Sequence, residues 1–327
     1  MRQIKHALIT VTLKPENEAK LTRALHGAEV SRCKPKDTAA IAKALETADV
    51  AILQSDLDEL ILTGPKLKWI HCCHAGLNKS ARPEVFERGI LLTGSAGRSA
   101  QALAEHAMMF MLALTYDVPG LLAMQRQHSW QTPPGYEKRS SLMGKTVGII
   151  GTGNTGVALA ERCKAFGMHT LGYRRKAEPI PFIDTMYAQG TPGGLESLLQ
   201  ASDYVVLCIN LSDATYHLLG DTQLRLMKPT AYLVNMARGE VVDEDALVAL
   251  LRSGAIAGAG LDTVTGEPLK ADSPLWDLPN VMITPHTTPA LPDREERALS
   301  YVLENIRAYR EGEPMVNQVT QVDIYTK

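Results

Sequence analysis

The sequence predicts an α/β protein with two doubly wound, mainly parallel sheets. Short apolar strands alternate with amphipathic helices along almost the whole chain, and this pattern restarts at Lys145 after a polar segment. Strands separated by helices need right-handed crossovers, and they therefore form mainly parallel sheets. A chain of 327 residues also exceeds what one hydrophobic core usually organises, so two domains are expected.

The first hundred residues predict a small open α/β domain. Its strands are expected at residues 5–11, 50–53, 69–72 and 91–93. An apolar helix is expected next, at residues 99–114. The polar segment 128–141 contains Pro133, Pro134 and Gly135, and this composition predicts a loop that leads to the second sheet.

The second sheet begins directly after Lys145. Its strands are expected at residues 146–150, 170–173, 204–209, 231–235 and 257–261. A helix at 155–166 follows the first strand, and an amphipathic helix at 293–311 comes near the end of the chain. We expect this last helix to return to the first domain. Residues 1–98 and 291–327 would then form one domain and residues 99–290 the other.

Charge and hydropathy narrow the class of partner. The 34 Lys and Arg residues nearly balance the 36 Asp and Glu residues, and neither sign gathers in long blocks. The most apolar helical stretch, residues 102–124, is interrupted by Glu105, His106, Asp117 and Pro119, which predicts a buried helix pair or a subunit interface rather than a membrane span. We therefore expect a small-molecule partner, with no nucleic acid and no membrane.

The cysteine pattern and the N-terminus predict a cytoplasmic protein. There are five cysteines, an odd number with no CxxC spacing, which is typical of reduced thiols. The N-terminal apolar run is not followed by a small-residue cleavage site. Cys72 and Cys73 lack His or Cys partners at metal-ligand spacing, so core packing is favoured and no metal is expected.

A glycine-rich motif follows the first strand of the second sheet. The strand TVGII runs into GTGNTG, which supplies Gly151, Gly153 and Gly156 and opens a helix at Asn154 and Thr155. Such glycines allow a tight turn and let backbone N–H groups approach a pyrophosphate at the helix N-terminus. The motif alone is a weak signal. Between a strand and a helix in an alternating pattern it predicts dinucleotide binding rather than a plain turn.

The next strand ends in basic residues, HTLGYRRK. An NAD-binding domain usually has a carboxylate here for the ribose hydroxyls, but this chain has Arg174, followed by Arg175 and Lys176. Guanidinium groups suit a 2′-phosphate, so NADP(H) is the preferred cofactor. The alternative is a solvated basic turn in a protein that also accepts NAD(H).

Three later segments place polar residues directly after expected strands. They contain Arg238, then Asp262 and Glu267, and then His286. Carboxyl ends of neighbouring parallel strands meet at one edge of the sheet, so these side chains can converge although they are distant in sequence. Taken singly, each has a structural alternative as an ion-pair partner, a turn residue or a loop histidine. Together, beside a dinucleotide motif, they predict an active site.

The residue types fit reduction of a keto acid. A carbonyl that accepts a hydride becomes an alkoxide and needs a proton, and histidine transfers protons readily near neutral pH. His286 is therefore the expected general acid, with Glu267 holding its ring. The planar guanidinium of Arg238 suits the carboxylate and the carbonyl oxygen of the substrate.

The motifs HAGLN, LAEHA, GTGNTG, VNMARGEVVDEDAL, GLDTVTGEPL and PLWDLPNVMITPH occur in one order along nearly the whole chain. In this the chain resembles the D-isomer-specific 2-hydroxyacid dehydrogenase family. The resemblance implies two flavodoxin/Rossmann-like domains, with the cofactor domain inserted into the substrate domain, and a homodimer formed through the cofactor domain. It implies that Asp262 binds the nicotinamide carboxamide. It also implies that the backbone N–H groups of Ala75, Gly76 and Leu77 bind the substrate carboxylate.

Arg174 makes the chain most similar to NADPH-using glyoxylate/hydroxypyruvate reductases of that family. The expected function is reduction of a small 2-keto acid to the D-2-hydroxy acid. Two alternatives stay open: a nucleotide-sensing, corepressor-like protein-binding module, and a phosphite dehydrogenase, which Lys79 near the carboxylate loop would suit. His106 in LAEHA lies on an apolar helix and is interpreted as a buried, hydrogen-bonded histidine outside the site.

Overall fold

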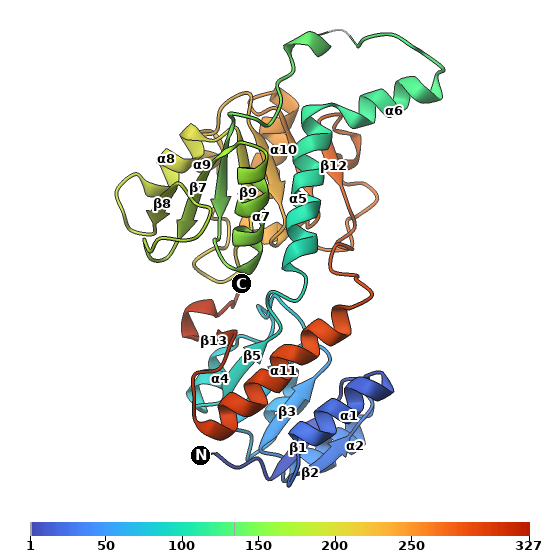
Figure 1. Cartoon of the computed structure of the whole chain (residues 1–327), viewed down its shortest axis with the longest axis vertical. Coiled ribbons are helices and arrows are strands. Elements are labelled where there is room, and N and C mark those ends of the chain that lie inside the picture. The colour runs from blue at the N-terminus through green and yellow to red at the C-terminus, as the bar shows by residue number, and fades with distance from the viewer. Residues whose placement is uncertain (1, 134) are drawn as a thin grey trace. The chain divides into compact units, whose positions relative to one another are not determined.

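The computed structural model describes residues 2–133 and 135–327 (Figure 1). Its contacts divide the chain into two units. The first unit holds the residues up to Ser99, those from Ala290 onward and the short segment Leu211–Ala214. The second unit holds Ala100–Asn210 and Thr215–Pro289. Leu211–Ala214 joins the first unit, where the Asp213 N–H donates to the Ile324 carbonyl at 2.8 Å.

The first unit is one sheet covered by helices on both faces. Its strands are β1 (His6–Ile9), β2 (Glu29–Arg32), β3 (Val50–Leu53), β4 (Trp69–Cys72), β5 (Leu91–Gly94) and β13 (Gln318–Val319). They lie in the order β13-β5-β4-β3-β1-β2, and only β13 is antiparallel to its neighbour. The parallel part has the flavodoxin-like order 2-1-3-4-5.

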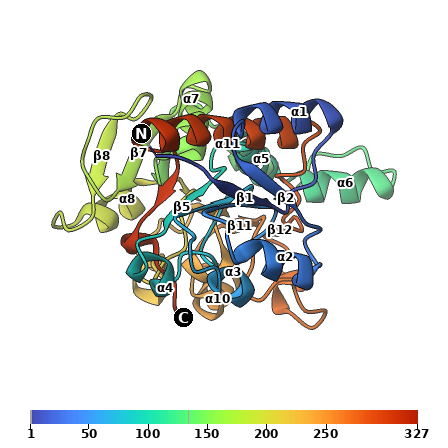
Figure 2. The same cartoon turned by 90° about the horizontal axis from the view of Figure 1, so that it is seen from below.

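Two helix layers bury the apolar side chains of this sheet. The helices are α1 (Pro15–Ala24), α2 (Thr38–Leu45), α3 (Glu59–Leu62), α4 (Pro83–Glu87) and α11 (Arg294–Glu311). Helices α1 and α11 lie side by side on one face (Figure 2), and α2, α3 and α4 cover the other. On the α11 face Trp69 stacks on Tyr309, with ring centroids 5.2 Å apart, so the C-terminal helix completes the core of the N-terminal sheet.

The second unit contains a seven-stranded parallel sheet. Its strands are β6 (Thr146–Ile150), β7 (His169–Arg174), β8 (Thr185–Ala188), β9 (Tyr204–Leu207), β10 (Tyr232–Asn235), β11 (Gly258–Leu261) and β12 (Val281–Ile283). They lie in the order β12-β11-β10-β9-β6-β7-β8. From β6 the chain adds strands on one side, to β7 and β8, and then returns to add β9 to β12 on the other side, so the strand order reverses between β6 and β9. In open α/β sheets ligands bind at the carboxyl ends of the strands beside such a reversal.

Helices cover both faces of this second sheet. They are α5 (Ala100–Thr115), α7 (Asn154–Ala165), α8 (Gly194–Ala201), α9 (Asp221–Leu224) and α10 (Glu244–Ser253). Helix α6 (Val118–Arg126) follows α5 and contacts that helix. Helices α5 and α7 pack together over one face, where Phe110 and Met111 are fully buried. A Cβ at Gly260 would lie 2.6 Å from the Phe110 ring, so glycine in β11 lets α5 approach the sheet closely.

The predicted α/β class with two doubly wound parallel sheets is confirmed. Strands β3, β4 and β6 begin and end at the predicted residues. Strands β2, β8, β12 and β13 were not among the expected strands, because they lie at sheet edges and their partly exposed side chains give little apolar signal. The predicted loop after α6 contains a short 3-10 turn, Tyr136–Lys138, and its Pro134 lies outside the described residues.

The expected buried helix pair is only half correct. Helix α5 is mostly buried, but α6 has no buried residue and exposes Leu121 and Leu122, so burial within the chain was wrong for α6 and the alternative of a subunit interface stays a prediction. Its apolar residues gave a core-like signal without packing on the sheet. Within residues 2–133 and 135–327, no single helix is long and apolar enough to cross a membrane. Helices α5 and α6 pass that test only as a pair, which is bent by 63° at its break.

Candidate active site

The glycine-rich turn GTGNTG joins β6 to α7, as predicted. Gly151 has φ +96°, and a Cβ there would lie 2.5 Å from the Cys208 carbonyl oxygen. A Cβ at Gly156 would lie 2.1 Å from the Gly151 carbonyl oxygen. These two glycines are required by the protein's own backbone, because no side chain fits between the turn, α7 and the end of β9.

Gly153 differs from the other two. A Cβ at this position would meet no atom within 4 Å, and its φ of −82° suits any residue. Helix α7 starts directly after Gly153, and among the described residues no side chain caps its first turn, which contains Asn154 and Thr155. Open space in front of uncapped helical N–H groups fits a pyrophosphate at a helix N-terminus. The residues present therefore fit a dinucleotide.

Alanine substitutions at these glycines should separate folding from cofactor binding. We expect Gly156→Ala to lower the free energy of unfolding by about 3 kcal/mol, because its Cβ collides with backbone. Gly153→Ala should change that free energy by less than about 0.5 kcal/mol and weaken NADPH binding at least about tenfold. Urea unfolding and NADPH fluorescence titration measure both. Equal affinity of Gly153→Ala and wild type would contradict the assignment of this turn.

Strand β7 ends at Arg174, beside the glycine-rich turn on β6. Tyr173 is buried, Arg174 is half-buried and Arg175 is exposed. Since β7 is the direct neighbour of β6, the Arg174 side chain leaves the sheet at the edge that carries Gly151–Gly156. The end of β7 thus places Arg174 and Arg175 at the carboxyl edge of the sheet, next to the glycine-rich turn.

His286 and Glu267 form a hydrogen-bonded pair in the second unit. The distance between His286 Nδ1 and Glu267 Oε2 is 2.8 Å, and the other carboxylate oxygen, Oε1, accepts from the Val264 N–H at 3.2 Å. Both side chains are about one third exposed. The pair leaves the Nε2 atom of His286 on the opposite side of the ring, where it can exchange a proton with a ligand.

Arg238 is presented by a turn that Asn235 organises. Asn235 accepts from the Ala237 N–H at 2.9 Å and donates through Nδ2 to the Arg238 carbonyl at 3.0 Å. The next residue, Gly239, is pressed against the loop that leads to Glu267: a Cβ there would lie 2.0 Å from the Val264 carbonyl carbon. Glycine is therefore needed to bring the Arg238 turn and the Glu267 loop together.

Asp262 follows β11 and is almost completely buried, at 2% exposure. Its Oδ1 atom accepts a hydrogen bond from the Thr284 hydroxyl at 2.6 Å. Thr284 follows β12, two residues before His286. The loops after β10, β11 and β12 thus carry Arg238, Asp262, Glu267 and His286 at one edge of one sheet.

The predicted carboxylate-binding loop lies in the first unit, directly after β4. It contains Ala75, Gly76 and Leu77, with Gly76 at φ +75° and Leu77 buried at 8% exposure. Leu77 anchors the loop, since its carbonyl accepts from the N–H groups of Ser80 and Ala81 at 2.9 and 2.8 Å. The positive φ explains why glycine stands in the middle of the loop.

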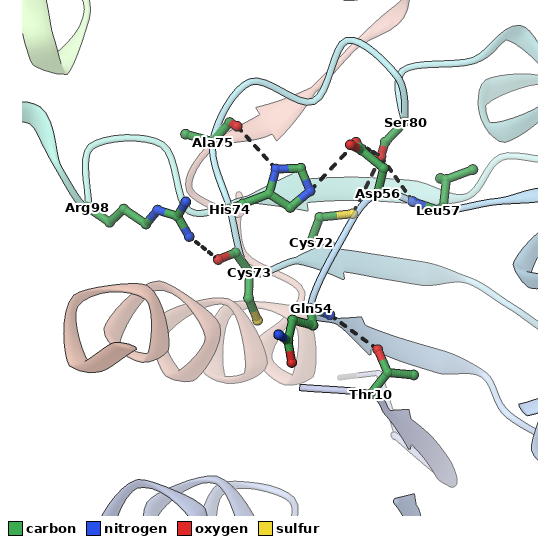
Figure 3. A network of polar contacts seen from close by, with 10 residues as sticks. All are labelled: Thr10, Gln54, Asp56, Leu57, Cys72, Cys73, His74, Ala75, Ser80 and Arg98. Atoms are coloured by element: carbon green, nitrogen blue, oxygen red, sulfur yellow. Dashed lines mark hydrogen bonds and ion pairs between the residues drawn. The ribbon is translucent and has the colours of Figure 1, made fainter. Parts of the chain in front are cut away.

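Polar contacts hold both flanks of this loop (Figure 3). The Ser80 hydroxyl donates to Asp56 Oδ1 at 2.5 Å, and His74 Nε2 lies 3.6 Å from the same oxygen. On the other side the Arg98 guanidinium donates to the Cys73 carbonyl. None of Asp56, Ser80 and Arg98 was singled out from the sequence, because each acts through contacts with a segment 23 to 25 residues away.

Cys72 and Cys73 are buried, as core packing requires. Burial raises the pKa of both thiols to about 12, so neither is a reactive thiolate at neutral pH. In the described part of the chain, no group of three or more His, Cys, Asp or Glu side chains is arranged to hold a metal ion.

Comparison with known proteins identifies the family. Residues 108–288 match the family described as "D-isomer specific 2-hydroxyacid dehydrogenase, NAD binding domain". The chain is 36% identical to the glyoxylate reductase of Korarchaeum cryptofilum over 278 residues, which is 83% of this chain and 82% of that protein. It is also 36% identical to the glyoxylate reductase of Thermococcus litoralis, over 82% of this chain and 81% of that one.

Solved structures of the same family are similar to this chain over almost its whole length. A D-isomer specific 2-hydroxyacid dehydrogenase from Xanthobacter autotrophicus Py2, in complex with NADPH and MES, has a TM-score of 0.81 and 27% identity, covering 98% of this chain and 99% of that one. An NADPH-dependent glyoxylate/hydroxypyruvate reductase from Sinorhizobium meliloti, in complex with NADP and sulfate, has a TM-score of 0.80 and 25% identity with the same coverage. The chain therefore belongs to the D-isomer specific 2-hydroxyacid dehydrogenase family and is an NAD(P)-dependent oxidoreductase, which confirms the predicted family.

Proposed function

We propose that the protein reduces a small 2-keto acid of the glyoxylate and hydroxypyruvate type to the D-2-hydroxy acid, with NADPH as the preferred cofactor. The observation that carries the proposal is the 2.8 Å pair of His286 and Glu267, on the same unit as the glycine-rich turn Gly151–Gly156. The glyoxylate reductases at 36% identity support the substrate class.

In this mechanism the protein orients the keto acid and supplies the proton. NADPH, when bound, supplies the hydride that reduces the carbonyl carbon. Arg238 binds a substrate carboxylate oxygen and the carbonyl oxygen, so its charge opposes the negative charge that develops there. His286 donates the proton from Nε2 to that oxygen, and Glu267 stabilises the imidazolium before transfer. In the reverse direction the neutral imidazole accepts the proton.

The remaining proposed contacts are with backbone and cofactor. The loop of the first unit, Ala75, Gly76 and Leu77, contributes N–H groups to the substrate carboxylate. Asp262 accepts a hydrogen bond from the nicotinamide carboxamide. In this proposal residues 99–290 form the dinucleotide-binding domain, while residues 1–98 and 291–327 form the substrate domain. The family match over 108–288 supports the first of these assignments.

The rates of NADPH and NADH oxidation test this function directly. Glyoxylate, hydroxypyruvate, pyruvate and phenylpyruvate should be supplied in turn, and we expect turnover with at least one of the two smallest acids. No turnover with any of them, despite tight NADPH binding, would contradict the proposal. A protein-binding module would then be tested by partner capture, and a phosphite dehydrogenase by NADP⁺ reduction with phosphite.

Arg174 is expected to set the cofactor preference. Arg174→Asp should lower kcat/KM for NADPH at least about tenfold, because a charge-assisted hydrogen bond to the 2′-phosphate is lost, and should leave or improve the value for NADH. Lys176→Ala, which removes an exposed charge two residues later, is the matched control and should change the ratio much less. An unchanged NADPH to NADH ratio in Arg174→Asp would exclude this role.

We also propose a homodimer formed through the second unit, in a protein located in the cytoplasm. Helix α5 and its surroundings carry an apolar surface hollow of about 580 Å³ that includes Met109, Tyr116 and Phe166. Met109 is 40% and Phe166 44% exposed, and α6 adds Leu121 and Leu122. Such a patch is typical of an interface. The five free cysteines support the reducing location.

The mass in solution tests the assembly. Light scattering should give about 71 kDa, twice the 35.6 kDa of one chain. Met109→Glu should give the monomer mass, because a charge in the centre of an apolar interface is costly. Phe182→Glu replaces an exposed aromatic residue, 46% exposed against 40% for Met109, that does not line the hollow, and it should leave the dimer intact. A wild-type monomer would contradict the proposal.

A further inference from the structure

Three polar side chains form a chain of hydrogen bonds that ends at Asp262. His106 on α5 lies with Nε2 2.9 Å from the Thr284 hydroxyl, and that hydroxyl lies 2.6 Å from Asp262 Oδ1. His106 Nε2 itself is 3.9 Å from the same carboxylate oxygen. Asp262 is 2% exposed, so its hydrogen bonds are made almost entirely within the protein. His106 is thus hydrogen-bonded, as the sequence predicts, but to a partner that its apolar helix did not indicate.

The direction of each hydrogen bond follows from the proton count. A carboxylate can only accept, so Thr284 gives its single hydroxyl proton to Asp262. The Thr284 oxygen must then accept from His106, which places a proton on the Nε2 atom of the imidazole. Burial lowers the pKa of His106, and the charge of Asp262 only partly opposes this, which favours the neutral ring. The geometry therefore selects the Nε2–H tautomer.

Close packing fixes the position of His106. Its ring meets Phe110, one turn along α5, edge to face with centroids 4.9 Å apart. Phe110 in turn lies against Gly260 of β11, where a Cβ would be only 2.6 Å from the ring. Helix α5 is thus held against β11, the strand directly before Asp262. The packing of α5 on β11 therefore fixes His106 relative to the Asp262 carboxylate.

Backbone hydrogen bonds fix the positions of Thr284 and Asp262. The Thr284 N–H donates to the Leu261 carbonyl at 2.9 Å, and the Asp262 N–H donates to the Asn235 carbonyl at 3.1 Å. Both residues therefore continue the register of β10, β11 and β12 beyond the strand ends. A neutral donor behind a hydroxyl polarises that hydroxyl and strengthens its bond to the carboxylate. Oδ1 is held in this way, and no residue in the described part of the chain donates a hydrogen bond to Oδ2, which is the atom proposed to accept from a ligand.

We propose that His106 and Thr284 are positioning residues that hold the Asp262 carboxylate in the orientation in which it binds the nicotinamide carboxamide. This rests on the proposed function, in which Asp262 accepts a hydrogen bond from that amide. The relay acts on the nicotinamide end of the cofactor and leaves the adenosine end to Gly151–Gly156 and Arg174. It makes the site selective for a complete dinucleotide over a nucleotide that lacks the nicotinamide ring.

The test compares NADPH with 2′-phospho-ADP-ribose, which lacks nicotinamide. His106→Leu removes the imidazole N–H donor, and Thr284→Val removes the hydroxyl donor; each changes the side-chain volume little. We expect each to weaken NADPH binding about tenfold and to leave the affinity for 2′-phospho-ADP-ribose within about twofold of wild type. The conservative variants His106→Gln and Thr284→Ser keep a donor at each place and should restore most of the NADPH affinity.

Asp262→Ala separates the two levels of the proposal. Asp262→Ala could weaken the binding of NADPH but not of 2′-phospho-ADP-ribose, while His106→Leu and Thr284→Val leave NADPH binding unchanged. In that case the relay is wrong and the role of Asp262 stands. If Asp262→Ala does not discriminate between the ligands, the contact with the carboxamide is itself wrong. Equal weakening of both ligands in His106→Leu would show a purely structural role and would also overturn the relay.

A nitrogen-15 spectrum of histidine-labelled protein gives a second readout that needs no ligand. At pH 7.5 the His106 ring should show a protonated Nε2 and an unprotonated Nδ1, assigned by its loss in His106→Gln. A proton on Nδ1 instead would contradict the direction of the hydrogen bonds and overturn the relay.

Discussion

Replacement of His286 by alanine is expected to lower kcat/KM for glyoxylate about a thousandfold and to leave NADPH affinity unchanged. A positioned general acid contributes about 10²- to 10⁴-fold, and no other described side chain is hydrogen-bonded to Glu267 in a way that could replace it. The loss should fall mainly on kcat, because the proton is transferred in the reacting complex. Steady-state rates and a fluorescence titration with NADPH measure the two parts.

Two further variants define this result. Glu267→Gln keeps a side chain that can hydrogen-bond to Nδ1 but removes its charge, so we expect a smaller loss, about ten- to hundredfold. His169→Ala removes an exposed histidine at the start of β7 and should retain nearly full activity. Retention of more than about a tenth of kcat/KM in His286→Ala would exclude His286 as the acid.

Arg238→Ala is expected to lower kcat/KM by about a thousandfold, with both a higher KM for the keto acid and a lower kcat. The KM rises because the carboxylate loses charge-assisted hydrogen bonds, and kcat falls because the developing alkoxide loses its opposing charge. NADPH affinity should change little. Steady-state kinetics with glyoxylate, varied at saturating NADPH, separate the two effects.

Arg238→Lys should recover only part of the lost activity, because an ammonium group cannot reproduce two parallel hydrogen bonds from a planar fork. The control is Arg252→Ala, which removes an exposed arginine from the last turn of α10 in the same unit. If only KM changed in Arg238→Ala, with kcat unaltered, Arg238 would bind substrate without stabilising the alkoxide, contrary to the mechanism.

The central strands of both sheets could be predicted from the sequence because they are buried on both faces. The runs VAIL at Val50–Leu53 and VGII at 147–150 have no polar side chain, and each is followed by turn residues. The edge strand Glu29–Arg32 has the sequence EVSR and half-exposed side chains, so its pairing with β1 determines its structure more than its own composition does. Helix α6 shows the opposite failure, since it is apolar without being buried in the chain.

The site residues also divide into those that their own residue type and position reveal and those that only tertiary contacts reveal. Gly151, Gly156 and the His286 and Glu267 pair could be anticipated, because their residue types and their place after strands carry the chemistry. The contacts of Asn235 and Thr284 could not, since hydroxyl and amide side chains serve many structural purposes. His106 meets Thr284 across 178 residues of sequence, a contact that only the packing of α5 on the sheet creates.

Transfer of deuterium tests the central claim most directly. NADPH carrying deuterium at C4, in the 4R and the 4S form in turn, should be incubated with hydroxypyruvate and the protein, and the product analysed by mass spectrometry and chiral chromatography. The account predicts D-glycerate, with one deuterium at C2 from one of the two forms and none from the other. A product without deuterium from either form, or no glycerate at all, would contradict hydride transfer to a 2-keto acid.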